Sequence, residues 1–299
     1  MNTGVIQLVT YATPEGSAVG LIYQGKIYAS PRYTDMQQVL DDWYAANERL
    51  ADLGDKLAIR EGVDASTLLA PLCPRQIYFA GVNYVDHVEE MKRTLGLQLD
   101  PAPKASGQEP WFCMKSVHSV VGPNAAISPP KNTVMLDWEV ELAVVIGKKV
   151  RDVRVDEALD CVAGYTIAND LSDRAFVARK GVADSSPFKW DWIGQKSFDG
   201  ACPLGPAITP ARFIGDVNNL SLKLWVNGEL MQDSNTSRMI FNAADLVSAL
   251  SHSITLHPGD VILTGTPSGV GMARKQFLKS GDVVRQSIEN IGEFEFRIK

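Results

Sequence analysis

Near the amino terminus, short runs of β-branched and aromatic residues alternate with turn residues. The runs IQLVTYA (6–12) and AVGLIYQ (18–24) flank the turn TPEGS, which is typical of adjacent strands. Between residues 36 and 52 the apolar positions recur at helical spacing, which predicts one helix with an apolar stripe. A second short helix is expected near 64–70. We therefore assign residues 1–74 to a small N-terminal α+β domain.

Beyond this first domain the pattern changes to apolar strands that follow one another closely. IYFAGV (77–82) is an unbroken apolar run, the pattern of a strand covered on both faces, and NYVDHVEEMKR (83–93) has helical character. LKLWVNGEL predicts a hairpin with its turn at Asn227 and Gly228. Strands outnumber long helices without regular βαβ alternation, so we expect a β-rich α+β fold over residues 75–299, not a doubly wound sheet.

Composition and charge narrow the classes of protein to which the chain can belong. The 299 residues are 45% hydrophobic and 21% charged, and 29 basic against 35 acidic residues give a net charge of −6. A mildly acidic chain gives no support to nucleic-acid binding, and no apolar run is long enough to span a membrane. The start lacks a basic stretch before an apolar core, so we expect no signal peptide. Four widely spaced cysteines fit reduced thiols in a cytoplasmic protein.

Two acids share one face of a strand in the middle of the chain. LDWEVELAVVIGKKV (136–150) predicts one long strand with a turn at Gly147 and Lys148, and Glu139 and Glu141 point to the same side of it because side chains alternate. Asp170 ends another predicted strand, GYTIAND. Three neighbouring carboxylates repel one another, and Mg²⁺ or Mn²⁺ would relieve that repulsion through oxygen ligands. The alternative is two solvated glutamates on an edge strand and an aspartate that caps a turn.

Other candidate chemistry lies on either side of these acids. His87 and Glu90 share a helix face, as in a general base that activates water, although a surface histidine beside helix acids has the same spacing. Lys196, between glycines in GQKSFDG, could reach an anionic substrate or an enolate, or be an ordinary loop lysine. The run 95–110 is rich in Gly, Pro and small polar residues, which is typical of a mobile loop or lid. GTPSGVG (265–271) lacks the lysine of a phosphate-binding loop, so we expect no nucleotide site.

These segments, in this order, resemble the fumarylacetoacetate hydrolase family over residues 75–299. The runs that carry the resemblance are GVNYVDHVEEM (81–91), DWEVELAVVIGKKVRDV (137–153), ALDCVAGYTIANDLSDR (158–174), GQKSFDGACPLGP (194–206), VNGEL (226–230) and LHPGDVILTGTPSGVG (256–271). Each run alone is a weak signal, but six in register are specific. The resemblance implies a mixed β-roll catalytic domain that follows the small N-terminal domain and pairs into a homodimer.

The resemblance also implies a role for each candidate residue. Three acids match the family's ligands for Mg²⁺ or Mn²⁺: Glu139, Glu141 and Asp170. Three residues match its catalytic groups: His87 and Glu90 as the pair that activates water, and Lys196 near the metal-bound substrate. Three more lie in runs that match the substrate site: Arg174, Thr266 and Tyr84. The implied partner is a small 2-oxo acid.

Two departures separate this chain from parts of the family. Relatives often carry a glutamine three residues after the arginine matched by Arg174, where this chain has Val177. A substrate contact would then be missing, which affects specificity. Animal-type fumarylacetoacetases use a fourth acidic ligand upstream of the histidine, whereas Ala80 and Gly81 occupy that region here. The chain therefore resembles the branch that uses three carboxylates.

The first functional hypothesis is hydrolysis of a carbon–carbon bond in an acylpyruvate or related 2,4-dioxo acid. Water activated by His87 would attack the distal carbonyl, and a pyruvate-like fragment would leave as an enolate stabilised by the metal and Lys196. Fumaryl- or maleylpyruvate-like products of aromatic catabolism and diketo-deoxy sugar acids both fit. Alternatives at the same site are a decarboxylase of oxaloacetate-like acids and a hydratase or isomerase of unsaturated 2-oxo acids. A third alternative is a scaffold without catalysis, which would not need a buried acid cluster.

Overall fold

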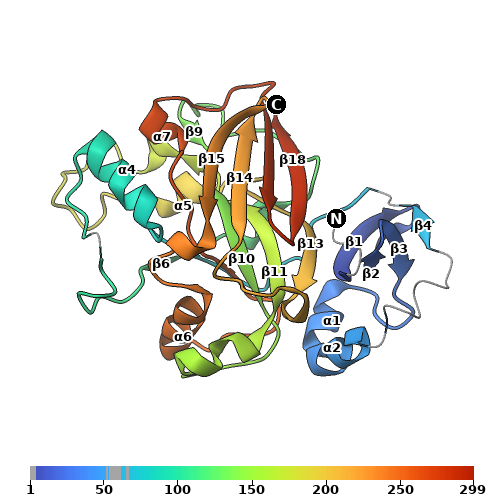
Figure 1. The fold of residues 1–299 in the computed structure, drawn as a ribbon. Coiled ribbons are helices and arrows are strands. Elements are labelled where there is room, and N and C mark those ends of the chain that lie inside the picture. The colour runs from blue at the N-terminus through green and yellow to red at the C-terminus, as the bar shows by residue number, and fades with distance from the viewer. Residues whose placement is uncertain (1–4, 52, 54–61, 65–66, 101) are drawn as a thin grey trace.

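One large central sheet dominates the computed structural model of the chain (Figure 1). The structure describes residues 5–51, 53, 62–64, 67–100 and 102–299. Within that part, the central strands are hydrogen-bonded in the order β4-β3-β2-β1-β13-β11-β10-β16-β5-β6, and β7 pairs with β13. Their bounds are β1 Gln7–Thr13, β2 Gly16–Tyr23, β3 Lys26–Ala29, β4 Val63–Asp64, β5 Ile77–Ala80, β6 Phe112–Lys115, β7 Val120–Val121, β10 Val140–Ile146, β11 Val162–Asn169, β13 Cys202–Pro210 and β16 Val261–Leu263.

A five-stranded sheet packs against one face of the central sheet. Its order is β15-β14-β17-β18-β8, and a separate strand pair joins β12 to β9. The bounds are β8 Ala126–Ile127, β9 Leu136–Asp137, β12 Ser172–Asp173, β14 Ser221–Val226, β15 Glu229–Asn235, β17 Val283–Ile288 and β18 Gly292–Ile298. The β14–β15 hairpin turns at Asn227 and Gly228, whose φ angles of 51° and 84° confirm the predicted turn.

Helices cover the sheets and do not alternate with the strands, so the β-rich α+β prediction is confirmed. The described α-helices are α1 Met36–Asp41, α2 Trp43–Ala51, α4 Val85–Leu95, α5 Trp192–Lys196, α6 Ala243–Ser253 and α7 Gly271–Arg274. Short 3₁₀ turns are η1 Val117–Ser119, η2 Val155–Cys161, η3 Arg174–Phe176, η4 Ala211–Phe213 and η5 Thr236–Arg238. Figure 1 shows α1 and α2 beside the N-terminal strands, with α4 at the opposite side of the molecule.

Both faces of β10 are buried, which explains why its sequence LAVVI is apolar at every position. Leu142 and Val144 point to the core shared with the five-stranded sheet and α6. Ala143 and Val145 point to the opposite face, where they pack in a second core that contains Phe79. Because the side chains alternate, Glu141 lies on this second face, at the end of the strand.

The helix predicted over residues 36–52 is divided in two. α1 ends at Asp41, and Asp42 follows with a non-helical backbone (φ −102°, ψ 29°) before α2 begins. The Asp42 carboxylate accepts a hydrogen bond from the Tyr33 hydroxyl at 2.6 Å, and Arg49 donates to the same hydroxyl. The apolar spacing does not encode these polar contacts, which accompany the break.

The strand predicted over residues 136–150 is also divided, into β9 and β10. Between them, the Trp138 indole donates to the Gly269 carbonyl at 3.1 Å, and the Trp138 backbone N–H donates to the Asp137 carboxylate at 2.8 Å. Contacts with a distant loop therefore replace the strand pairing at this point.

Near residues 64–70 the structure contradicts the predicted short helix. The described residues there contain the end of β4, and Leu69 donates its backbone N–H to the Thr10 carbonyl at 2.9 Å, which extends the sheet beside β1. Residues 65 and 66 lie outside the described part. β1 itself pairs with β13 at Leu8 and Ile208. The division of the chain into two domains at residue 74 stays a prediction.

Candidate metal centre and active site

Register and strand alternation bring three acids together at one end of β10. Glu141 lies opposite Ala168 on β11, and Asp170 follows β11 directly. The Asp170 backbone N–H donates to the Glu139 carbonyl at 2.9 Å. One carboxylate oxygen from each acid lies within 4.8 Å of the others. The residues Glu139, Glu141 and Asp170 are 5%, 1% and 1% exposed, so the alternative of solvated surface acids is wrong.

Three cationic side chains offset much of this negative charge. Lys196, at the end of α5, donates from Nζ to Glu139 Oε2 (2.8 Å) and Asp170 Oδ2 (2.5 Å). Lys115 on β6 pairs with the other oxygen of Asp170. Arg174 pairs with the other oxygen of Glu139. Both lysines are buried, which contradicts the alternative of Lys196 as an ordinary loop lysine.

The positive charge is shared unequally among the acids. Burial disfavours the charged form of Glu139, but Lys196 and Arg174 outweigh it and lower the pKa of Glu139 to about 2. Burial, with repulsion from Asp170 and Glu139, raises the pKa of Glu141 well above its ordinary value. Glu141 is therefore the acid whose charge the protein leaves least compensated.

The donor set around Glu141 fits a divalent cation. Among the described residues Glu141 forms no ion pair, and it accepts a hydrogen bond from the Gly265 N–H at 2.6 Å. A buried carboxylate that lacks a cationic partner is unfavourable, and a bound divalent ion would supply the missing charge. Carboxylate oxygens are the ligands that Mg²⁺ and Mn²⁺ prefer. Glu139, Glu141 and Asp170 would hold such an ion.

The His87–Glu90 pair forms on α4, next to the acid cluster. His87 Nδ1 and Glu90 Oε2 are 3.1 Å apart, and both residues are 6% exposed, so the alternative of a surface histidine is wrong. The Gly269 N–H donates to the other Glu90 oxygen at 2.9 Å. His87 is close enough to Glu139 to contribute to its lowered pKa. The pair and the cluster therefore belong to one site.

The glycine-rich loop 265–271 holds the acids of this site through its backbone. Four of its N–H groups donate to carboxylates: Gly265 to Glu141, Ser268 to Asp86, Gly269 to Glu90 and Gly271 to Asp137. Gly269 has a φ of 102°, and a Cβ at this position would lie 2.1 Å from the Met231 carbonyl oxygen. A larger residue there would displace the loop, and with it the hydrogen bonds that support these carboxylates.

Asp137 is a buried acid of the site that the sequence analysis misses. It accepts hydrogen bonds from Arg174 Nε at 2.9 Å and from the backbone N–H groups of Gly271 and Met272 at 2.6 and 3.0 Å. Burial raises the pKa of Asp137, although Arg174 acts in the opposite direction. Asp137 thus fixes the guanidinium that pairs with Glu139. Its alternation with Glu139 in the sequence is a signal that could identify it.

Thr266 and Tyr84, two of the predicted substrate contacts, are both buried. The Thr266 hydroxyl donates to the Val140 carbonyl at 2.9 Å and accepts from Gln232 Nε2 at 2.9 Å. Tyr84 is fully buried, and burial and the charge of Glu141 raise the pKa of its phenol. Both side chains lie beside the acid cluster, and their role toward a substrate stays a prediction, as does that of Arg174.

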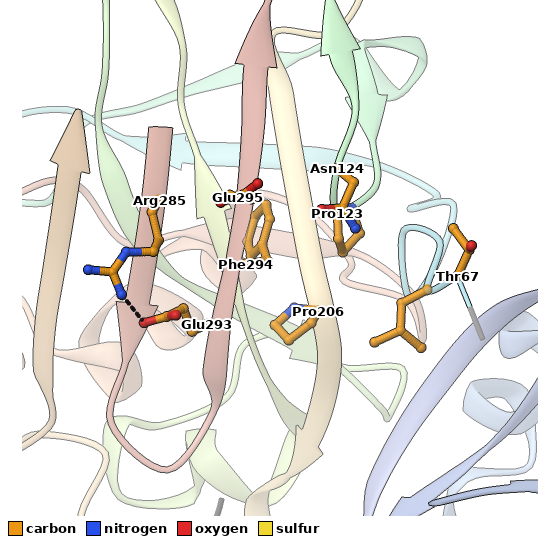
Figure 2. A pocket seen from close by; sticks show the side chains of 9 residues that line it. Thr67, Pro123, Asn124, Pro206, Arg285, Glu293, Phe294 and Glu295 are labelled. Atoms are coloured by element: carbon orange, nitrogen blue, oxygen red, sulfur yellow. Dashed lines mark hydrogen bonds and ion pairs between the residues drawn. The ribbon is translucent and has the colours of Figure 1, made fainter. Parts of the chain in front are cut away.

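Two of the cavities lined by described residues lie away from this site. One has a volume of about 320 Å³ and is lined by residues of the N-terminal part of the chain and of β17 and β18. Its lining side chains are drawn in Figure 2, among them Arg285 and Glu293, which form an ion pair with an N–O distance of 3.0 Å. The other, of about 590 Å³, lies between β1–β3 and α1–α2. Their described linings include none of the predicted site residues. The chemistry of the acid cluster, and not cavity size, identifies the candidate site.

Comparison with known proteins shows the class to which this architecture belongs. Residues 76–299 match the model of the fumarylacetoacetate (FAA) hydrolase C-terminal domain, which covers well over half of the chain. The chain therefore belongs to the fumarylacetoacetate hydrolase family, and the resemblance inferred from the sequence is confirmed.

Individual relatives have different activities. The oxaloacetate tautomerase fahd2 of Xenopus laevis, described as mitochondrial, is 44% identical over 229 residues, 76% of this chain and 66% of that protein. The chain thus spans slightly less than two thirds of that relative's length. A fumarylacetoacetate hydrolase from Exiguobacterium antarcticum has a TM-score of 0.80 at 29% identity, covering 98% of this chain and 99% of its own. A maleylpyruvate hydrolase from Sphingobium sp. SYK-6, solved with manganese(II) and pyruvate, has a TM-score of 0.75 at 26% identity, with 98% of each chain covered.

In the part of the chain that the structure describes, no helix combines the length and apolar character needed to cross a bilayer. The cytoplasmic location expected from the cysteines stays a prediction.

Proposed function

We propose that the protein is a divalent-metal-dependent enzyme that interconverts the keto and enol forms of oxaloacetate or a similar 2-oxo acid. One observation carries the proposal: the buried cluster of Glu139, Glu141 and Asp170 lies beside the His87–Glu90 pair. A divalent metal ion held by these three acids would bind the oxygens of an α-keto carboxylate, and a histidine oriented by a carboxylate is suited to proton transfer. The activity of the Xenopus laevis relative supports the substrate class.

Each group has a defined task in this reaction. Mg²⁺ or Mn²⁺, when bound, would supply Lewis-acid polarisation of the 2-oxo group. His87 accepts a proton from the carbon beside that carbonyl and returns it to the enolate oxygen, while Glu90 holds the imidazole in place. Lys196 uses two of its three N–H donors on Glu139 and Asp170, which leaves the third for the oxygen on which charge develops.

Hydrolysis of an acylpyruvate is the second candidate, and the same His87–Glu90 pair favours it. His87 would deprotonate a water that attacks the distal carbonyl carbon. A methylene group joins the two carbonyl carbons, and its bond to the distal carbonyl carbon would then break. The products are a carboxylic acid and the enolate of pyruvate, which takes up the proton. The Sphingobium maleylpyruvate hydrolase, solved with pyruvate, supports this alternative.

A substrate panel tests the two candidates against each other. The purified protein is given the enol form of oxaloacetate and, separately, a set of acylpyruvates, each with Mg²⁺, with Mn²⁺ or with a chelator. Metal-dependent decay of the enol absorbance without cleavage of acylpyruvates supports the tautomerase, and pyruvate release from an acylpyruvate supports the hydrolase. Carbon dioxide release from oxaloacetate would identify a decarboxylase instead.

A control variant makes the panel decisive. Glu141→Ala removes a proposed metal ligand, so any rate that survives in this variant comes from free metal ions and not from the site. If the wild type matches this variant on every substrate, the catalytic proposal fails and a scaffold role replaces it. The homodimer that the family resemblance predicts is tested separately, by sedimentation equilibrium of the metal-loaded protein.

A further inference from the structure

Lys196 stands at the end of α5, a helix of only five residues. A helix this short is not stable through its own hydrogen bonds, so contacts with the rest of the protein must fix it. Trp192 and Lys196 are four residues apart and therefore share one face of the helix. Both meet aromatic rings of the β5–β6 region, at opposite ends of that face.

A row of aromatic rings connects these two ends. The Trp192 and Trp111 ring centroids are 5.1 Å apart. Trp111 meets Phe79 on β5 edge-on at 6.0 Å, and Lys196 Nζ lies 5.2 Å from the centroid of the Phe79 ring. Gly81 leaves room for the row, because a Cβ at this position would lie 2.4 Å from the Trp111 ring.

Strand geometry explains why this row lies beside the acid cluster. Phe79 pairs with Cys113 on β6, so Phe79, Cys113 and Lys115 point to one face of the sheet. Lys115 reaches Asp170 from that face. The surface on which α5 rests is therefore the same surface that carries the acids.

The contact between Trp111 and Trp192 is not deep core packing. Trp111 is 46% exposed, so its ring contributes more to the docking of α5 than to the interior. A second contact lies just beyond the helix, where the Ser116 N–H donates to the Ser197 hydroxyl at 3.1 Å. The ammonium of a lysine sits on a flexible four-carbon stem, so its position depends on how firmly its backbone is held.

We propose that Trp111 and Trp192 are positioning residues that dock α5 and thereby hold the Lys196 ammonium between Glu139 and Asp170. The catalytic consequence rests on the proposed function, whereas the positional claim does not. Loss of either indole frees α5 to move away from the sheet, and Lys196 then leaves its two carboxylates for part of the time. A phenylalanine at position 111 keeps an aromatic contact and preserves most of the effect.

Chemical labelling of Lys196 tests the positional claim without any measurement of turnover. Trace acetylation of the folded protein, read by peptide mass spectrometry, gives the rate at which Lys196 reacts relative to exposed lysines. We expect this rate to rise at least fivefold in Trp111→Ala and Trp192→Ala and less than twofold in Trp111→Phe. Trp225→Ala is the matched control, because it removes a ring from a cation–π contact with Arg285 (4.0 Å) on the other sheet. An unchanged Lys196 rate in both alanine variants overturns the proposal.

A double-mutant cycle tests the catalytic consequence. Trp111→Ala should lower kcat about tenfold, with little change in KM, on whichever substrate the panel identifies. In the Lys196→Met background, the same substitution should lower kcat by less than a further twofold. Additive losses would show that Trp111 does not act through Lys196 and would overturn the proposal. If Lys196→Met leaves turnover unchanged, the role given to Lys196 under the proposed function fails, and the labelling result still decides the positional claim. Circular dichroism establishes that each variant is folded, and the leucine variant at the same position, Trp111→Leu or Trp192→Leu, replaces any alanine variant that is not, because it removes the ring but keeps apolar volume.

Discussion

The acid cluster at the end of β10 and the His87–Glu90 pair on α4 share one site but are held in different ways. The cluster belongs to strands that are buried on both faces, and three cations pair with two of its acids. Carboxylates paired in this way are held in one position. The cluster is therefore suited to hold a metal ion rather than to exchange protons.

Within the described part of the chain, the pair on α4 has no lysine or arginine partner of this kind. Glu90 accepts hydrogen bonds from the imidazole and from the Gly269 N–H, and no lysine or arginine of the described residues pairs with it. In α4 only His87, Val88 and Glu90 are buried, whereas every residue of β10 and β11 is buried. A carboxylate that only orients an imidazole leaves the ring able to accept and return a proton. The contrast separates charge stabilisation from proton transfer within one site.

Removal of Glu141 should abolish metal binding by the acid cluster, and this is the largest effect that we expect. Glu141→Ala should abolish the rise in melting temperature that Mn²⁺ produces and lower turnover about 1,000-fold, since a bound metal contributes several kcal/mol to charge stabilisation. Calorimetric titration with Mn²⁺ measures the binding directly. Because Glu141 is buried without an ion pair, the metal-free variant should be no less stable than the wild type. Full metal affinity in Glu141→Ala would remove Glu141 from the ligand set.

Removal of His87 should abolish proton transfer and leave metal binding by the acid cluster intact. His87→Ala should lower turnover about 100- to 1,000-fold, within the range for a general base, while the affinity for Mn²⁺ changes less than about twofold. Steady-state kinetics and the same titration provide the two readouts. Glu90→Gln is the milder companion variant, with a smaller loss, because the imidazole remains. A turnover close to that of the wild type in His87→Ala would refute the proton-transfer role.

The acid cluster was predictable because its signal is local. Strand alternation placed Glu139 and Glu141 on one face, and the end of the next strand placed Asp170 beside them. Asp137 continues the same alternation, and extending the period two residues upstream identifies it. The order of the buried runs likewise predicted a strand-rich α+β fold, since each apolar run encodes its own strand.

Features that depend on distant partners were not predictable. Lys115 reaches Asp170 across 55 residues of sequence, and the contact exists only because β5 and β16 connect β6 to β10 in the sheet. The interruption at Trp138 likewise depends on the Gly269 carbonyl, 131 residues away. Neither partner leaves a periodic mark in the sequence around the residue it fixes.

Loss of Lys115 tests the contribution of the buried ion pairs of the acid cluster to the free energy of unfolding. Lys115→Met should destabilise the metal-free protein by about 3 kcal/mol, because it leaves Asp170 buried with half of its cationic support. Lys223→Met is the matched control, since the exposed pair of Lys223 with Asp233 (3.6 Å) should contribute less than about 1 kcal/mol. Urea unfolding measures both. Equal losses in the two variants would show that burial does not distinguish these pairs, and Asp170→Asn added to Lys115→Met should recover part of the loss.

The smallest expected effect is a change in acid sensitivity. The pKa of Glu139 is lowered to about 2 in the folded protein, against an ordinary value near 4.5, so its stabilising contribution is complete above pH 4.5 and is lost as the pH falls toward 2. In that window Glu139 alone makes stability fall by up to about 1.4 kcal/mol per pH unit. Lys196→Met removes one of the two cations responsible, so the pKa of Glu139 should rise and the acid slope should become shallower. Urea unfolding at pH 5, 4 and 3 with a chelator measures the slope, with Lys223→Met as the reference. Identical slopes in the two variants would mean that Arg174 alone lowers the pKa of Glu139. Lys196 would then not stabilise the charge of the acid cluster.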